Sequence, residues 1–112
     1  MNILFVCTPN RDRSSTAEIH FQNKYPLDRF RSAGINKYLS ERHGGIHLKK
    51  YMLDIADRII CAEFVHSDWI VQNIDKKYLS KIEILHLGDT EPFMSENLIQ
   101  ILEDKFQLKG DV

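Results

Sequence analysis

Short apolar runs alternate with amphipathic stretches along the whole chain. The first run, residues 3–6, contains β-branched and aromatic side chains and ends at a polar turn that includes a proline. Such a run is typical of a strand that is buried on both faces of a parallel sheet. From Ser14 onward, apolar residues recur at the four-residue spacing of a helix, at Ala17, Phe21 and Tyr25. The chain is therefore expected to begin as strand, polar loop and helix.

The rest of the chain repeats this alternation. Further strands are predicted over residues 30–35, 57–62 and 81–87, further helices over 46–56, 63–78 and 95–108, a polar turn-rich segment over 36–45, and a tail over 109–112. Strands that alternate with helices favour a parallel sheet joined by right-handed crossovers. We therefore predict an α/β fold, a four-stranded parallel sheet flanked by helices, in a single domain over residues 1–112.

The start of the first helix carries several candidate caps. Ser14, Ser15 and Thr16 can each accept a hydrogen bond from the first turn, and Glu18 follows Ser15 at the spacing of a capping box. A helix that begins here directs its free N–H groups and the positive end of its dipole toward the preceding loop. The loop should therefore attract an anion.

The loop itself has the composition of an oxyanion site, because it opens with Cys7 and closes with Arg13. Backbone N–H groups in such a loop form a nest for a phosphate-like ion, and a guanidinium can hold two of its oxygens. The same positive field favours the thiolate of Cys7, which would be a nucleophile directed at phosphorus. The alternative is that Cys7 is a small buried hydrophobe and Arg13 a solvated residue.

The spacing of Cys7, Arg13 and Ser14 resembles the signature of the protein tyrosine phosphatases. The position near the N-terminus, Asn10 as the third residue after the cysteine, and the following Ser-Thr-Ala-Glu over 15–18 are similar to the low-molecular-weight branch, particularly its shorter bacterial members. The resemblance implies a low-molecular-weight phosphatase-like fold and hydrolysis of a phosphomonoester through a phosphocysteine, with no metal and no organic cofactor.

The resemblance assigns a role to each residue of the loop. Cys7 would attack phosphorus, Arg13 and the loop amides would bind the phosphate oxygens, and Ser14 would hydrogen-bond the thiolate. The phosphate-binding loop would consist of Thr8, Asn10, Arg11, Asp12, Arg13 and Ser14. Ser32, in a Ser-Ala-Gly sequence, would support Asn10, a residue type that tolerates left-handed backbone.

Two more residues are placed at the edge of the site by the resemblance. Asp89, in the predicted loop over 88–92 and shortly before Phe93-Met94, would protonate the leaving oxygen and later activate water. Tyr38 would line the wall of the substrate cleft. The alternatives are that Asp89 is a turn residue that follows glycine and that Tyr38 covers an edge of the core.

Three residues depart from the family pattern. Pro9 has no N–H to offer an anion. Asp12 places a carboxylate beside Arg13, where longer members often have a second cysteine, and Glu91 stands where an aromatic would flank a phosphotyrosine ring. The phosphorylated substrate is therefore left open between a phosphotyrosine protein and a small phosphomonoester.

Two other functions remain open at this point. One is a phosphate-binding or interaction module with little turnover. The other is an arsenate reductase, which would need a relay cysteine, and Cys61 is poorly placed for this because it falls in a predicted strand where packing is its expected role.

Composition narrows the classes of partner. The chain has 112 residues, a net charge of −1, 43% apolar residues and 28% charged residues, so we expect neither a nucleic-acid surface nor a membrane surface. Two cysteines and no recognisable export signal favour the reducing cytoplasm, and a monomer or weak dimer is expected. No metal site is predicted. Three of the five histidines, His20, His66 and His86, are expected at the surface or at edges.

Overall fold

The computed structural model describes residues 1–108, and its elements follow the predicted alternation. The elements are β1 (Asn2–Cys7), α1 (Arg13–Lys24), β2 (Arg29–Gly34), α2 (Lys37–Arg42), α3 (Lys50–Ile55), β3 (Arg58–Cys61), α4 (Phe64–Asn73), the 3₁₀ helix η1 (Lys76–Lys81), β4 (Ile82–Ile84) and α5 (Glu96–Lys105). The tail predicted over 109–112 lies outside the described residues.

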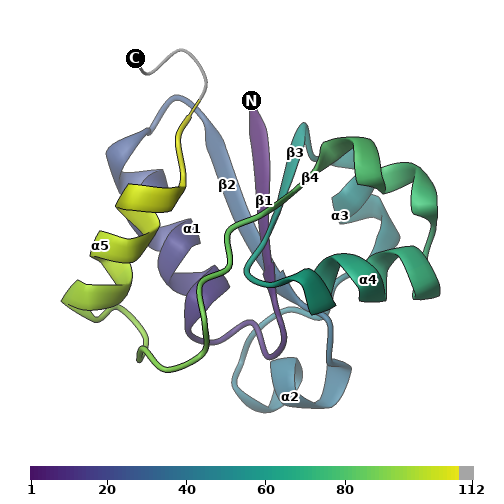
Figure 1. Ribbon diagram of the computed structural model, residues 1–112, viewed down its shortest axis with the longest axis horizontal. Helices are drawn as coiled ribbons and strands as arrows, with labels where there is room; N and C mark the ends of the chain where they lie inside the picture. The colour runs from purple at the N-terminus through teal and green to yellow at the C-terminus, as the bar shows by residue number, and fades with distance from the viewer. Residues whose placement is uncertain (109–112) are drawn as a thin grey trace.

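Within residues 1–108, four strands form one parallel sheet in the order β2-β1-β3-β4. The central strand β1 pairs with β2 from Asn2 opposite Arg29 to Cys7 opposite Gly34. Helices α1 and α5 cover one face of the sheet, and α3 and α4 cover the other (Figure 1). The predicted α/β fold, a four-stranded parallel sheet flanked by helices, is confirmed.

The side chains of β1 are buried on both faces of the sheet, as its apolar sequence predicted. Ile3 and Phe5 pack in the cluster beneath α1 and α5, whereas Leu4 and Val6 pack in the cluster beneath α3 and α4. The ring of Phe5 lies 5.8 Å from that of Phe21, a distance at which aromatic pairs attract each other. Packing on both faces fixes the direction in which β1 delivers its last residue to the edge of the sheet.

Several elements differ from the sequence expectation: the helix predicted over 46–56 spans only Lys50–Ile55, the strand predicted over 81–87 spans only Ile82–Ile84, and two further differences concern local caps. The turn-rich segment over 36–45 contains α2, because Asn36 caps it by accepting a hydrogen bond from the Leu39 N–H at 2.9 Å. The helix predicted over 63–78 ends at Asn73, and Asp75 then starts η1 by accepting from the Lys77 N–H at 2.8 Å. In both places a local side-chain cap begins a separate element.

The start of α1 also differs from the expectation. Its N-cap residue is Asp12, not one of the three hydroxyl residues that were predicted. The Ser15 hydroxyl donates to the carbonyl of Asn10 at 3.0 Å, and the Thr16 hydroxyl accepts from the Met94 N–H at 2.9 Å. The Ser15 hydroxyl thus bonds back to the preceding loop and the Thr16 hydroxyl bonds to a segment 78 residues away, so neither caps the helix.

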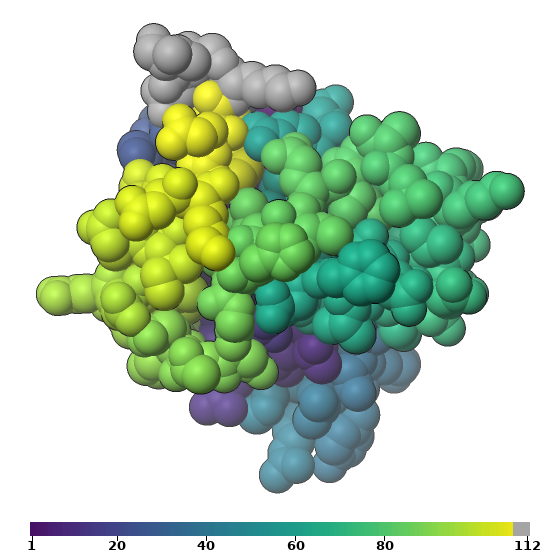
Figure 2. Space-filling model, viewed as in Figure 1, coloured from purple at the N-terminus to yellow at the C-terminus, as the bar shows by residue number. Residues whose placement is uncertain are grey.

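The carboxyl ends of the strands meet at the lower edge of Figure 1, beside α2, the loop after β1 and the segment after β4. In Figure 2 the purple N-terminal segment is exposed at this edge, between the green segment that follows β4 and the blue region of α2. Open parallel sheets bind their ligands at such an edge. No helix within residues 1–108 has the length and apolar character needed to cross a membrane.

Candidate functional site

The loop between β1 and α1 is organised around Asn10, which is 5% exposed and has a φ of 49°. Its Nδ2 donates to Ser14 Oγ at 3.0 Å and to Ser32 Oγ at 2.9 Å. Its Oδ1 accepts from the Ile46 N–H at 2.7 Å. These contacts hold a left-handed backbone conformation that asparagine adopts more readily than most other residues.

Two glycines allow neighbouring backbone to approach this loop closely. A Cβ atom at Gly34 would lie 2.7 Å from both the Asn10 nitrogen and the Thr8 oxygen. A Cβ atom at Gly45 would lie 2.6 Å from the Asn10 oxygen. Real side chains do not fit at such distances, so the loop requires glycine at both positions.

Cys7 lies at the end of β1 and is fully buried, with its Sγ 2.9 Å from Ser14 Oγ. Ser14 accepts a hydrogen bond from the Asn10 amide, so its own hydroxyl hydrogen is free to be donated to sulfur. A hydrogen bond of this kind stabilises a thiolate relative to a thiol. The geometry thus places a hydroxyl that can donate directly against the Cys7 sulfur.

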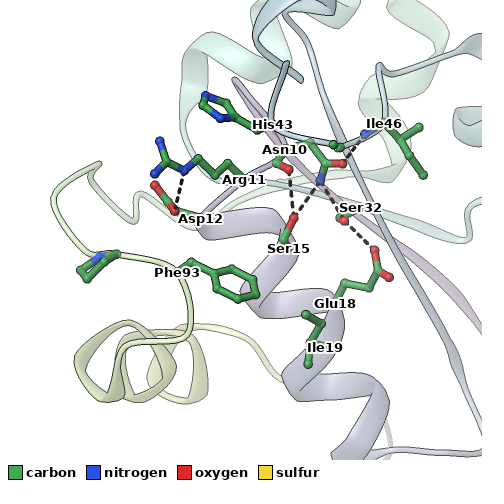
Figure 3. Close-up of a pocket in the computed structure, with 13 residues that line it drawn as sticks. Asn10, Arg11, Asp12, Ser15, Glu18, Ile19, Ser32, His43, Ile46 and Phe93 are labelled. Atoms are coloured by element: carbon green, nitrogen blue, oxygen red, sulfur yellow. Dashed lines mark hydrogen bonds and ion pairs between the residues drawn. The ribbon is translucent and has the colours of Figure 1, made fainter. Parts of the chain in front are cut away.

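The contacts of Asn10 continue through Ser32 to Glu18, which the sequence suggested only as part of a cap. Its Oε1 lies 2.5 Å from Ser32 Oγ, and a carboxylate can only accept, so Ser32 must donate to it. Ser32 is then left to accept from the Asn10 amide. Figure 3 shows this chain of contacts running from Glu18 through Ser32 to Asn10.

Arg13 connects the loop after β1 to the segment that carries Asp89. The guanidinium Nη1 donates to the Gly88 carbonyl at 3.0 Å, and Nε lies 3.5 Å from Asp89 Oδ1. The Arg13 side chain is only 5% exposed, while that of Asp89 is 71% exposed. The structure therefore brings Cys7, Arg13 and Asp89 to one edge of the sheet.

The prediction that His66 lies at the surface or at an edge is wrong, because this residue is fully buried in the first turn of α4. Its Nδ1 accepts from the Glu63 N–H at 3.0 Å, and its Nε2 lies 3.0 Å from Thr8 Oγ1. Burial, together with the positive charge of Arg13, lowers the pKa of His66 to about 4. Glu63 and His66 stand at the three-residue spacing of a reciprocal cap, which marks the start of α4 but does not indicate that the imidazole is buried.

An open groove of about 730 Å³ lies beside the loop (Figure 3). It is lined by Asn10, Arg11, Asp12, Ser15, Glu18, Ile19, Ser32, His43, Gly44, Gly45, Ile46, Pro92 and Phe93. Within it, Arg11 Nε lies 3.7 Å from Asp12 Oδ1. The Asp12 carboxylate is therefore partly neutralised by its neighbour, which weakens the repulsion that it would exert on an anion in the loop.

The remaining sequence candidates lie farther from the loop or inside the core. Tyr38 is 68% exposed on α2, where its ring centroid lies 5.9 Å from the Arg42 guanidinium. Cys61 is fully buried in β3, and burial raises the pKa of its thiol to about 12. An inert thiol of this kind packs in the sheet, as predicted, and disfavours a redox relay. Among residues 1–108, no group of three or more potential ligands could hold a metal ion.

Neither a protein-family model nor a curated protein matches this sequence, but solved structures match it over most of its length. The YwlE arginine phosphatase from Geobacillus stearothermophilus is 25% identical, with 93% of this chain and 91% of that chain covered and a TM-score of 0.65. The tyrosine phosphatase Wzb from Escherichia coli K30, solved with phosphate, is 20% identical, with 93% and 91% covered and a TM-score of 0.74.

A low molecular weight protein tyrosine phosphatase from T. tengcongensis is 23% identical, with 95% of this chain and 99% of that chain covered and a TM-score of 0.66. The chain therefore has the low-molecular-weight protein tyrosine phosphatase fold, and the fold that the resemblance implied is confirmed. At these identities the likeness shows the fold, while the chemistry has to be argued from the side chains of this chain.

Proposed function

We propose that this chain is a cysteine-dependent phosphatase that hydrolyses phosphomonoesters through a phosphocysteine on Cys7. One observation carries the proposal: Cys7 Sγ lies 2.9 Å from the Ser14 hydroxyl, beneath a loop that is closed by the buried guanidinium of Arg13. A thiolate stabilised by a hydroxyl and placed beside a fixed cation suits attack on a phosphoryl group.

In the first step, the Cys7 thiolate attacks phosphorus and a P–S bond forms while the P–O ester bond breaks. Arg13 and the backbone of residues 8–14 bind the phosphoryl oxygens as negative charge develops on them. Asp89 gives its proton to the departing oxygen, which leaves as an alcohol or phenol. The 3.5 Å contact between Arg13 and Asp89 supports placing the acid beside the bound phosphoryl group.

In the second step, water attacks the phosphocysteine and the P–S bond breaks. Asp89, now a carboxylate, takes the proton of the water, and inorganic phosphate and the Cys7 thiolate are released. The Ser14 hydroxyl stabilises the departing thiolate, as it does the free one. Each step uses side chains of the chain itself and needs no metal or organic cofactor.

The substrate is proposed to be a phosphotyrosine protein or a small phosphomonoester. Tyr38, exposed on α2, is proposed as part of the substrate wall. Glu91 accepts from the Asn97 amide at 2.5 Å, so its side chain is held against the start of α5 rather than left free to flank a substrate ring. Because one structural neighbour is an arginine phosphatase, phosphoarginine belongs in the panel of substrates.

The decisive experiment compares hydrolysis of a generic aryl phosphate by the wild type, Cys7→Ser and Cys61→Ala. We expect turnover in the wild type and in Cys61→Ala, and none in Cys7→Ser, because a serine at this position has no accessible anionic form at neutral pH. Tungstate binding, measured by calorimetry, distinguishes an enzyme from the alternative, a phosphate-binding module with little turnover. Wild-type protein that binds tungstate but hydrolyses no member of the substrate panel would be a phosphate-binding module.

We further propose that the protein acts in the cytoplasm as a monomer or weak dimer. Both cysteines are free, which suits a reducing compartment. Sedimentation at several protein concentrations tests the oligomeric state, and a stable dimer at low micromolar concentration would contradict it.

A further inference from the structure

The contact between Thr8 and His66 joins the phosphate-binding loop to the start of α4 and has no part in the mechanism given above. Nδ1 of His66 accepts from the Glu63 N–H at 3.0 Å, so the imidazole carries its hydrogen on Nε2. That hydrogen points at Thr8 Oγ1, which lies 3.0 Å away. His66 is therefore the donor in this pair and the threonine hydroxyl is the acceptor.

The Thr8 hydroxyl keeps a hydrogen to donate. A hydroxyl has one hydrogen and two lone pairs, and His66 occupies one of the lone pairs. Within residues 1–108, His66 is the side chain that hydrogen-bonds Thr8 Oγ1. Thr8 is partly exposed and follows Cys7 directly, at the mouth of the loop. Its remaining hydrogen is available to a ligand that enters there.

His66 also lies within electrostatic range of the two charged groups of the site, because the charges of both Arg13 and Asp89 act on its imidazole. The buried side chain of His66 thus contacts Thr8, within the loop that is proposed to hold an oxyanion. The loop also lacks one backbone donor, since Pro9 has no N–H. A side-chain donor next to the proline would replace it.

We propose that His66 is a positioning residue that holds the Thr8 hydroxyl as a donor to the oxyanion bound in the loop. The inference rests on the proposed function and adds a donor to it. The arrangement needs a neutral imidazole, because a protonated ring would carry a hydrogen on Nδ1 and lose the bond from the Glu63 N–H. The buried position of His66 keeps the ring neutral at ordinary pH.

The test measures tungstate affinity by calorimetry, together with phosphate inhibition of turnover. Thr8→Val removes the hydroxyl but keeps the shape of the side chain, and should weaken tungstate binding about tenfold, the usual effect of losing a hydrogen bond to a charged group. Thr8→Ser keeps the hydroxyl and should bind more tightly than Thr8→Val. Equal affinity of Thr8→Val and the wild type would overturn the proposal.

Two variants of His66 separate positioning from a structural role. His66→Asn keeps an acceptor for the Glu63 N–H but is too short to reach Thr8, whereas the amide of His66→Gln can reach it. We expect His66→Asn to weaken tungstate binding by a factor similar to Thr8→Val, and His66→Gln to weaken it less. In the Thr8→Val background, His66→Asn should cause no further loss.

The double variant, His66→Asn with Thr8→Val, also shows whether His66→Asn weakens binding by disturbing the fold. If His66→Asn weakens binding equally in both backgrounds, His66 acts through the fold and the proposal is wrong. If the wild type binds no tungstate, the proposed function fails first. If the wild type binds tungstate and hydrolyses an aryl phosphate, while Thr8→Val does both equally well, only the role of Thr8 and His66 fails.

Discussion

Two loops meet at the candidate site and are held in opposite ways. The loop after β1 is built on Asn10, which is 5% exposed and hydrogen-bonded through both atoms of its amide. The segment over 88–92 presents Asp89, which is 71% exposed and contacts the rest of the site through Arg13 at 3.5 Å. One loop is held by a buried network of hydrogen bonds, whereas the other is held at its surface, by Arg13 at Gly88 and Asp89 and by the contact of Glu91 with Asn97.

The difference indicates how the two halves of the proposed reaction depend on the protein. Oxyanion binding requires several N–H groups in fixed positions. Folding already orders these groups, so the free energy of anion binding is not spent on ordering them. Proton transfer requires one carboxyl group, which has to approach whichever leaving group is present. A rigid loop for phosphate and an exposed acid therefore fit an enzyme that accepts more than one leaving group.

The largest expected effect comes from breaking the fixed loop at its ends. Cys7→Ser should abolish turnover while retaining tungstate binding, and Arg13→Ala should lose both, because the guanidinium supplies the fixed charge and also contacts Gly88. Calorimetry and an aryl phosphate assay on the same preparations check this. Retained binding in Arg13→Ala would mean that the backbone nest alone holds the anion.

The next effect belongs to the exposed loop. Asp89→Asn should slow phosphotyrosine-like substrates by roughly 10²- to 10⁴-fold, the usual contribution of general acid catalysis. It should slow a substrate with an acidic phenol much less, because that leaving group departs without a proton. A plot of log kcat against leaving-group pKa checks the prediction. Asp12→Asn is the matched control. A steeper dependence of log kcat on leaving-group pKa in that variant would mean that Asp12 is the general acid.

The third prediction concerns stability and separates the two loops directly. Asn10→Ala should lower the free energy of unfolding by roughly 3 kcal/mol, because it removes a buried hydrogen-bond network and leaves alanine at positive φ. Asp89→Asn should change it by less than about 0.5 kcal/mol, as is usual for exposed positions. Urea unfolding of both variants provides the comparison. Equal losses would contradict the contrast between the loops.

The smallest expected effect is a pH dependence of stability that comes from His66. Its pKa is lowered to about 4 in the folded protein, so the unfolded chain binds more protons below pH 6.5. Stability is therefore retained above pH 6.5 and lost as the pH falls, by about 2 kcal/mol between pH 7 and pH 5. Urea midpoints across this range check it, and the loss should shrink in His66→Asn.

Much of the fold was predictable because it depends on local pattern. The apolar run over 3–6 and the four-residue spacing after Ser14 predict β1 and α1, and the structure contains both. Helix α2 was missed because its start depends on the single cap at Asn36 within a polar segment. Element boundaries of this kind are decided by individual hydrogen bonds rather than by periodicity.

Spacing alone predicted the part of the site that is contiguous in sequence, whereas Ser32 and Asp89 were placed there only by the family resemblance. Cys7, Arg13 and Ser14 lie within one short stretch, so their spacing identified them as candidate site residues. His66 is 58 residues from its partner Thr8, and burial of a histidine cannot be recognised from its neighbours in sequence. The contact of Glu18 with Ser32 also depends on how α1 packs against β2.

The contact between Glu18 and Ser32 has a consequence for how mutations at the site should be judged. The Glu18 carboxylate only accepts, so the Ser32 hydroxyl must direct its hydrogen at Glu18 and accept from the Asn10 amide, which the Ile46 N–H holds in the matching orientation. Glu18→Gln keeps the volume and outline of the side chain, but its amide can also donate, so the Ser32 hydroxyl is no longer required to direct its hydrogen at residue 18. At this position a substitute of the same shape is not equivalent to glutamate, because the network depends on the orientation of its hydrogen atoms.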